Sequence, residues 1–218
     1  MNKRWMVFAT AAAVVVAFAA GVMIFRDRSQ QEVARALQSN NDALVRAHSP
    51  VYGNPAARVT IVEFLDPACE TCRAFYPIVK GMVNAGFGQI RLVVRYATLH
   101  KGSDTAVQIL EAARQQGKYW EAVERALASQ PQWAAHHNPR PELIWGLIAD
   151  TGIDVAKARA AADSPEIDRL LKQDAADMRA LKVDKTPGFF VNGTPLRDFG
   201  AAQLKALVDQ ELAKARGQ

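Results

Sequence analysis

The 218-residue sequence contains very little cysteine, with Cys69 and Cys72 as its whole complement. So small a number argues against a disulfide-stapled scaffold, and because half of the residues are apolar, the chain can bury a core without staples. It also has no dense basic run with interleaved aromatic residues, and its formal net charge is only +5, which argues against a nucleic-acid groove. Internal repeats and low-complexity segments are absent as well.

Ligands for a closed zinc site are also missing. Such a site needs four ligands, but the chain has no second C-x-x-C, and its histidines, at positions 48, 100, 136 and 137, lack a usual ligand spacing. The sequence therefore predicts no resident metal and no cofactor. Two alternatives to redox chemistry stay open: a non-enzymatic module whose two thiolates bind a soft ion such as Cu(I), and a pair of inert core cysteines.

One long hydrophobic run is present, at the N-terminus. Two basic residues precede an uncharged stretch over residues 5–25, which as a helix is about 30 Å long and matches a bilayer core. Because basic residues stay in the cytoplasm, we expect residues 1–28 to anchor an exported domain in the cytoplasmic membrane, on its periplasmic or extracytoplasmic side. The small-x-small pattern at residues 17–19 leaves a cleaved signal peptide as the alternative.

Strand and helix patterns alternate after this segment. Residues 29–50 are polar and read as a helical stalk or linker. The run VTIVEFL at residues 59–65 is typical of a buried central strand, and a helical pattern from the cysteine pair to Gly86 follows it. The run IRLVVRYATL at residues 90–99 is a second strand, so the three elements predict a right-handed, parallel β-α-β unit.

The remainder of the chain predicts a helical insert and then a second β segment. Residues 104–182 show only helical signals, and GFFVNGTPLRD then predicts a hairpin with a type I′ turn at Asn192 and Gly193, followed by a final helix. This order predicts an α/β, thioredoxin-like fold over residues 51–103 and 183–216, with 104–182 as an inserted helical domain, preceded by the N-terminal transmembrane helix.

The position of the C-x-x-C favours redox chemistry. Cys69 is expected at a helix start, where free backbone amides and the helix dipole stabilise its thiolate and lower its pKa. Cys72, one turn deeper on the same face, is close enough to form a disulfide and is expected to be shielded. The predicted chemistry is attack of a thiolate on a disulfide, through a mixed disulfide that the second thiol resolves.

Three segments together carry a family resemblance: VTIVEFLDPACETC, LHKGSDTAVQILEAARQQGKYWEA and KTPGFFVNG. Over roughly residues 50–215 the chain resembles the exported, membrane-anchored members of the DsbA-like branch of the thioredoxin superfamily. The resemblance implies a thiol:disulfide oxidoreductase that passes its disulfide to exported proteins with cysteines and is reoxidised by a membrane redox partner. The alternative is a reductase or isomerase that a membrane partner keeps reduced.

The resemblance also carries over residues outside the C-x-x-C. Thr186 and Pro187 match the cis-proline segment beside the sulfurs, where an extended substrate would pair. Glu63 matches a buried acid of raised pKa that exchanges a proton with the second cysteine through a water, although a salt-bridged or exposed glutamate is an alternative. Pro77 matches a kink in the active-site helix, and His100 fits the pattern LH, where a capping or solvated role is the simpler interpretation.

The dipeptide between the cysteines departs from the best-known oxidases of this family, which have a Pro-His pair there. Here it is Glu70-Thr71. A glutamate next to Cys69 disfavours the thiolate, which opposes the effect of the helix terminus. We therefore interpret Glu70 and Thr71 as residues that tune the redox potential, and predict a weaker oxidant than a relative with histidine in this loop.

Overall fold

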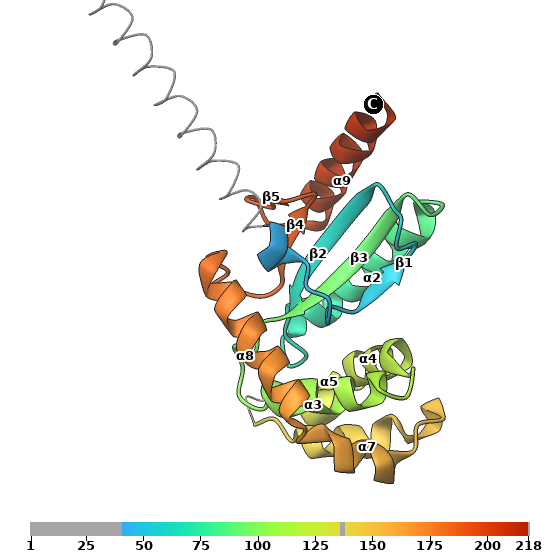
Figure 1. Cartoon of the computed structure of the whole chain (residues 1–218), viewed down its shortest axis with the longest axis vertical. Helices are drawn as coiled ribbons and strands as arrows, with labels where there is room; N and C mark the ends of the chain where they lie inside the picture. The colour runs from blue at the N-terminus through green and yellow to red at the C-terminus, as the bar shows by residue number, and fades with distance from the viewer. Residues whose placement is uncertain (1–40, 136–137, 218) are drawn as a thin grey trace, which may run out of the picture. The chain divides into compact units, whose positions relative to one another are not determined.

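The computed structural model describes residues 41–135 and 138–217 (Figure 1). The chain divides after Asp42 into two units, and every element named below lies in the second unit, which begins at Ala43. The expected membrane anchor at residues 1–28 lies outside the described residues. Among the helices that are described, none combines the length and the apolar character that a membrane span needs.

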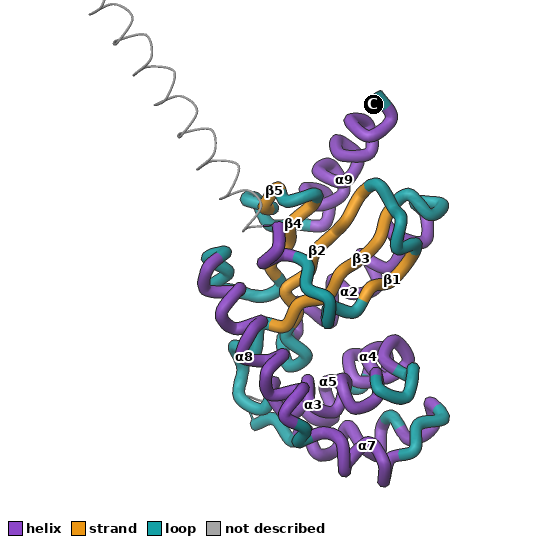
Figure 2. The backbone as a smooth tube through the Cα atoms, in the orientation of Figure 1, coloured by secondary structure: helices purple, strands orange, loops and turns teal. Residues whose placement is uncertain are grey.

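A five-stranded sheet forms the centre of the second unit, with the strand order β1-β3-β2-β4-β5 (Figure 2). β2 and β3 are parallel, as the expected β-α-β unit requires, and the other neighbouring pairs are antiparallel. The strands are β1 (Val51–Gly53), β2 (Val59–Leu65), β3 (Ile90–Tyr96), β4 (Gly188–Val191) and β5 (Thr194–Pro195).

Helices cover both faces of this sheet, and the remaining helices lie between β3 and α8 in the chain (Figure 1). α2 and α9 pack on one face, and α8 crosses β3 on the other. The helices are α2 (Glu70–Ala85), α3 (Ser103–Arg114), α4 (Tyr119–Ala128), α5 (Gln130–Trp133), α6 (Ile144–Leu147), α7 (Val155–Ala162), α8 (Pro165–Ala180) and α9 (Ala201–Arg216), with 3₁₀ turns η2 (Pro141–Leu143) and η3 (Ala149–Thr151).

The alternation of side chains along β2 explains where its one acidic residue points. Val62 and Phe64 belong to the apolar cluster on the α8 face, whereas Ile61 and Leu65 belong to the cluster that includes α2. Because successive side chains of a strand point to opposite faces, Glu63 shares the face of Ile61 and Leu65. The strand therefore directs this carboxyl toward α2, the helix that carries the cysteines.

Three features differ from the sequence-based expectation, each through tertiary contacts. β1 was not predicted from the sequence, but its three residues pair with β3. The expected helix over PELIWGLIAD is instead η2, α6 and η3, short turns that bury Ile144, Trp145 and Ile148. β3 ends at Tyr96, three residues before the expected end at Leu99, because the backbone amides of Leu99 and His100 donate to the Asp66 carboxylate and not to a neighbouring strand.

The buried β3 also carries an arginine that its apolar pattern did not single out. Arg95 is fully buried and binds Asp174 Oδ1 and Asp177 Oδ2 of α8, each at 2.6 Å. Arg46 and His48, just before β1, bind the same two carboxylates at 2.7 Å. Burial of a charge requires such pairing, so this network fixes α8 and the stretch before β1 on one face of the sheet.

Candidate functional site

Both cysteines lie at the junction of β2 and α2, as the sequence predicts. Cys69 precedes the first residue of α2 with an extended backbone (φ −77°, ψ 122°), and Pro77 lies inside the same helix. Cys72 is fully buried, Cys69 is 6% exposed, and both thiols are free. The backbone amide of Asp66 donates a hydrogen bond to Cys72 Sγ at 3.4 Å, which holds the inner thiol against the end of the strand.

The surroundings of Cys69 lower its pKa to about 5. A hydrogen bond from the Cys72 thiol is the largest cause and outweighs partial burial, which acts in the opposite direction. The Thr186 side chain and the backbone amides of Thr71 and Cys72 contribute further hydrogen bonds. Those amides belong to the first helical turn, where donors lack intrahelical partners and favour an anion. Cys69 is therefore a thiolate at neutral pH, while burial raises the pKa of Cys72 above that of a free thiol.

The segment before β4 meets the cysteines from a distant part of the sequence. The peptide bond between Thr186 and Pro187 is cis, as the resemblance implies. The Cys69 thiol, when protonated, donates a hydrogen bond to the Thr186 carbonyl oxygen at 3.4 Å, across 117 positions of the sequence. The fold thus places the predicted substrate-binding segment directly beside the outer sulfur.

Glu63 is fully buried behind the cysteine pair. Neither of its carboxylate oxygens has a hydrogen-bond partner among the described residues, so it is neither exposed nor salt-bridged there. Burial, and secondly the charge of Cys69, raises the pKa of Glu63 to about 8. Its charged form in turn raises the pKa of Cys72. Glu63 therefore holds a proton at neutral pH and is electrostatically coupled to both sulfurs.

An open pocket of about 670 Å³ adjoins the outer sulfur on the side of the helical segment. Cys69, Glu70, Thr71 and His100 are among the residues that line it. Glu70 and Thr71 are both exposed, so the dipeptide faces solvent at the mouth of the site. The effect of the Glu70 carboxylate on Cys69 is consequently screened by water.

A buried carboxylate that sequence analysis missed organises the loop around His100. Asp66 Oδ2 accepts hydrogen bonds from the backbone amides of Leu99 and His100 at 2.8 and 2.9 Å, and lies 2.8 Å from His100 Nδ1. Partial burial lowers the pKa of His100, but the hydrogen bond and charge of Asp66, and then the charge of Cys69, outweigh it and raise the pKa. His100 is thus positioned by Asp66 within electrostatic reach of Cys69. The sequence shows an aspartate directly after a strand, which is typical of a turn, but it does not show that Asp66 binds the backbone amides of Leu99 and His100.

Gln130 was also missed, and it links the helical segment to the cysteine loop. Its side chain is buried at the start of α5. Its Nε2 donates hydrogen bonds to the carbonyl oxygens of Pro67 at 2.8 Å and Cys69 at 2.9 Å. One amide group therefore satisfies two buried acceptors in the turn that precedes α2.

Replacing Gln130 with methionine should lower the free energy of unfolding by about 2 kcal/mol, because the buried carbonyl of Pro67 loses its donor and that of Cys69 loses one of two. Urea unfolding of the full chain measures the effect. The exposed Gln132 in the same short helix provides a matched control, and Gln132→Met should change the value by less than about 0.5 kcal/mol. An equal decrease in the free energy of unfolding in the two variants would show that the hydrogen bonds of Gln130 do not stabilise the fold.

Among the residues that the structure describes, no group of three or more histidine, cysteine, aspartate and glutamate side chains is arranged to hold a metal ion.

Comparison with known proteins places this site in a family. The sequence profile described as thioredoxin matches residues 46–210. The chain is similar to the crystal structure of a thioredoxin-like oxidoreductase from Silicibacter pomeroyi DSS-3, with 30% identity and a TM-score of 0.67 over 81% of this chain and 98% of that one. It is also similar to the thiol-disulfide exchange protein alpha-DsbA2 from Wolbachia pipientis, with 22% identity and a TM-score of 0.68 over 84% of this chain and 97% of that one.

Another similarity is to part of a much longer protein. The chain is 31% identical to the Na(+)/H(+) antiporter NhaA of Herminiimonas arsenicoxydans over 170 residues, which are 77% of this chain and 26% of the antiporter. The chain thus spans about a quarter of the length of that relative.

Proposed function

The chain belongs to the thioredoxin family, and from this premise we propose that it is a thiol:disulfide oxidoreductase that forms disulfide bonds in exported proteins. The observation that carries the proposal is the low pKa of Cys69, about 5, at a helix start beside the cis Thr186–Pro187 bond. A thiolate that is stable at neutral pH is a good leaving group in disulfide exchange.

The proposed reaction begins with the pair oxidised. A substrate thiolate attacks Cys69 Sγ, which forms a mixed disulfide between substrate and Cys69 and breaks the bond to Cys72. A second substrate thiolate then attacks the substrate sulfur of the mixed disulfide and releases Cys69 as a thiolate. The substrate loses two electrons and gains a disulfide, and the cysteine pair gains the two electrons.

Glu63 is the proposed proton donor for the inner sulfur. Cys72 leaves as a thiolate in a buried place where burial strongly favours the thiol. Because the pKa of Glu63 is raised to about 8, its carboxyl holds a proton at neutral pH that it can deliver to Cys72, through a water. The reverse transfer would generate the Cys72 thiolate when the pair is reoxidised.

Substrate binding is proposed at Thr186 and Pro187. An extended substrate segment would pair with the backbone of Thr186, as a strand added beside the disulfide, while Pro187 contributes no competing amide hydrogen. The carbonyl of Thr186 already lies 3.4 Å from Cys69 Sγ, so a segment paired here would present its cysteine to the reactive sulfur.

Electron flow is proposed to run from substrate to enzyme. The hydrogen bonds that lower the pKa of Cys69 stabilise the reduced pair, and stabilising the reduced form makes the disulfide more oxidising. The domain would work on the outer side of the cytoplasmic membrane, anchored by residues 1–28 and reoxidised by a membrane redox partner.

Thiol alkylation of the full chain in intact cells tests the direction. An oxidase should be recovered mainly with Cys69 and Cys72 joined in a disulfide. Recovery of a mainly reduced pair would contradict an oxidase and support the reductase or isomerase alternative, in which a membrane partner supplies electrons.

Glu70 is proposed to tune the potential weakly. Glu70→Gln removes a negative charge next to Cys69 and should lower the Cys69 pKa and raise the reduction potential. Because Glu70 is exposed, the equilibrium constant with glutathione should change by only about twofold. Titration of the thiolate absorbance measures the Cys69 pKa, and an unchanged pKa in the variant would contradict a role of Glu70 in tuning the potential.

A further inference from the structure

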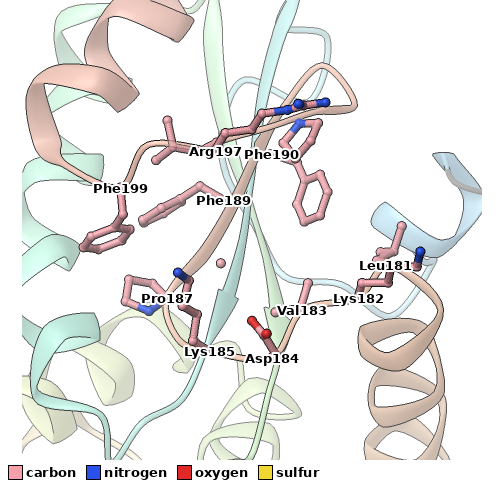
Figure 3. Close-up of a pocket in the computed structure, with 13 residues that line it drawn as sticks. Leu181, Lys182, Val183, Asp184, Lys185, Pro187, Phe189, Phe190, Arg197 and Phe199 are labelled. Atoms are coloured by element: carbon pink, nitrogen blue, oxygen red, sulfur yellow. The ribbon is translucent and has the colours of Figure 1, made fainter.

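A second pocket, of about 140 Å³, adjoins Pro187 of the cis peptide (Figure 3). Residues from the loop after α8, from β4, and from the loop before α9 line it. Pro187 belongs to this lining, and the preceding Thr186 contacts Cys69 Sγ. A chain bound beside the cis-proline would therefore continue over this pocket.

Aromatic rings form part of the apolar lining of the pocket. Phe189 and Phe199 line it, and their ring centroids are 6.4 Å apart in a stacked arrangement. Phe75 of α2 supports both, with centroids 5.7 Å from Phe189 and 4.7 Å from Phe199. Phe199 is nevertheless 44% exposed, so part of this apolar surface is open to a ligand.

Charged residues around these rings are mostly cationic. Lys182, Lys185 and Arg197 line the pocket with a single carboxylate, that of Asp184, so three positive charges face one negative charge. All four side chains belong to exposed residues, and Figure 3 shows Lys185 beside Pro187.

These cations differ from the surface lysines that form ion pairs. Lys172 and Lys205, for example, each form an ion pair with an aspartate one helical turn away. No carboxylate of the described residues lies within ion-pair distance of Lys182, Lys185 or Arg197. Their charge is thus uncompensated within the part of the chain that is described, next to an open apolar surface.

We propose that this pocket binds the substrate segment that flanks the reacting cysteine, and that it selects segments in which an apolar side chain is accompanied by acidic residues. The inference rests on the proposed function and adds a substrate class to it. The apolar side chain would lie against Phe189 and Phe199, and the carboxylates would face Lys185 and Arg197. Complementary charge of this kind raises the association rate and discriminates against like-charged segments.

The test uses three reduced dithiol peptides that are identical except for two positions beside one cysteine and share a leucine next to them. These positions are glutamate, glutamine or lysine. With the oxidised full chain at low salt, kcat/KM for the glutamate peptide should exceed that for the lysine peptide by about tenfold, and the preference should shrink in 0.5 M salt because the charges are exposed.

The double variant Lys185→Glu with Arg197→Glu should abolish or invert this preference. Because the readout is a ratio of two peptides measured on one protein sample, it does not depend on the fraction of active protein. Lys157→Glu on α7 makes the same kind of charge change at an exposed lysine that does not line the pocket, and it should leave the ratio unchanged.

The outcomes separate this inference from the function on which it rests. Equal rates for all three peptides, or a preference that survives the double variant, would overturn the selection of acidic segments and leave the oxidoreductase activity standing. No exchange with any peptide would overturn the proposed function, and the inference with it.

Discussion

Replacing Cys69 with serine should reduce the rate of disulfide exchange by at least about a thousandfold. Of the two cysteines, Cys69 is the one whose sulfur lies beside Thr186 and is a thiolate at neutral pH, and the variant lacks this sulfur. Serine keeps the size of the side chain but does not form a thiolate under these conditions. Oxidation of a reduced, unfolded substrate by the full chain, followed by the loss of substrate thiols, measures the effect.

Cys72→Ser provides the matched control. Cys69 remains reactive in this variant and can attack a substrate disulfide to form a mixed disulfide. The buried Cys72 thiol, which would reverse this step by displacing the substrate from Cys69, is missing, so covalent complexes with substrate should accumulate through Cys69. The assignment of the two roles would be wrong if Cys69→Ser were the variant that accumulated such complexes.

Replacing Glu63 with leucine should change the free energy of unfolding of the reduced protein in a pH-dependent way. The change at pH 7 should be more stabilising than the change at pH 4.5, by about 3 kcal/mol. The carboxyl ionises near pH 4.5 when the chain is unfolded, but its folded pKa is about 8. Between these values the folded protein holds a proton that the unfolded chain releases, so this group makes stability fall as pH rises, by about 1.4 kcal/mol per pH unit.

The ionisation of Cys69 has the opposite effect on the pH dependence of stability over much of the same pH range. Its folded pKa of about 5 lies below its unfolded value, so the unfolded chain holds the extra proton and stability rises with pH. In the reduced wild-type protein the two effects oppose each other between about pH 5 and 8. Glu63→Leu removes only the falling contribution, so the variant's stability should rise with pH across this window.

Urea unfolding of both proteins at a series of pH values, with the thiols kept reduced, measures this difference. Glu63→Gln serves as the control because it also lacks an ionising group and should show the same pH dependence, whatever its absolute stability. Parallel pH profiles for wild type and both variants would contradict a proton held by Glu63. In the exchange assay, Glu63→Leu should also slow the release of Cys72.

Local patterns in the sequence were enough to predict the central strands, the helix that follows the cysteines and the hairpin turn. Asn192 and Gly193 both have positive φ values, 45° and 84°, as a type I′ turn requires. Cys69 precedes α2, and the Thr186–Pro187 bond is cis, as predicted. The strands, the helix and the turn are each encoded in a few adjacent residues, which explains why the sequence revealed them, whereas the cis bond was implied by the family resemblance.

Contacts between distant residues were not predictable in this way. Gln130 reaches the Cys69 carbonyl across 61 positions, and Asp66 binds the Leu99 amide across 33. Arg95 stands in an otherwise apolar strand, and its carboxylate partners lie on α8, about 80 positions away. Nothing in the local sequence indicates which carbonyl or carboxylate a buried polar side chain will meet, because that depends on how the elements pack.

The reduction potential of the full chain, measured by equilibration with glutathione buffers, tests the central claim most directly. A low Cys69 pKa should make the pair oxidising, with a potential above about −200 mV, in the range of oxidising members of the thioredoxin superfamily. A potential at or below about −270 mV, the value typical of a thioredoxin that acts as a reductant, would contradict the claim that this protein donates disulfide bonds.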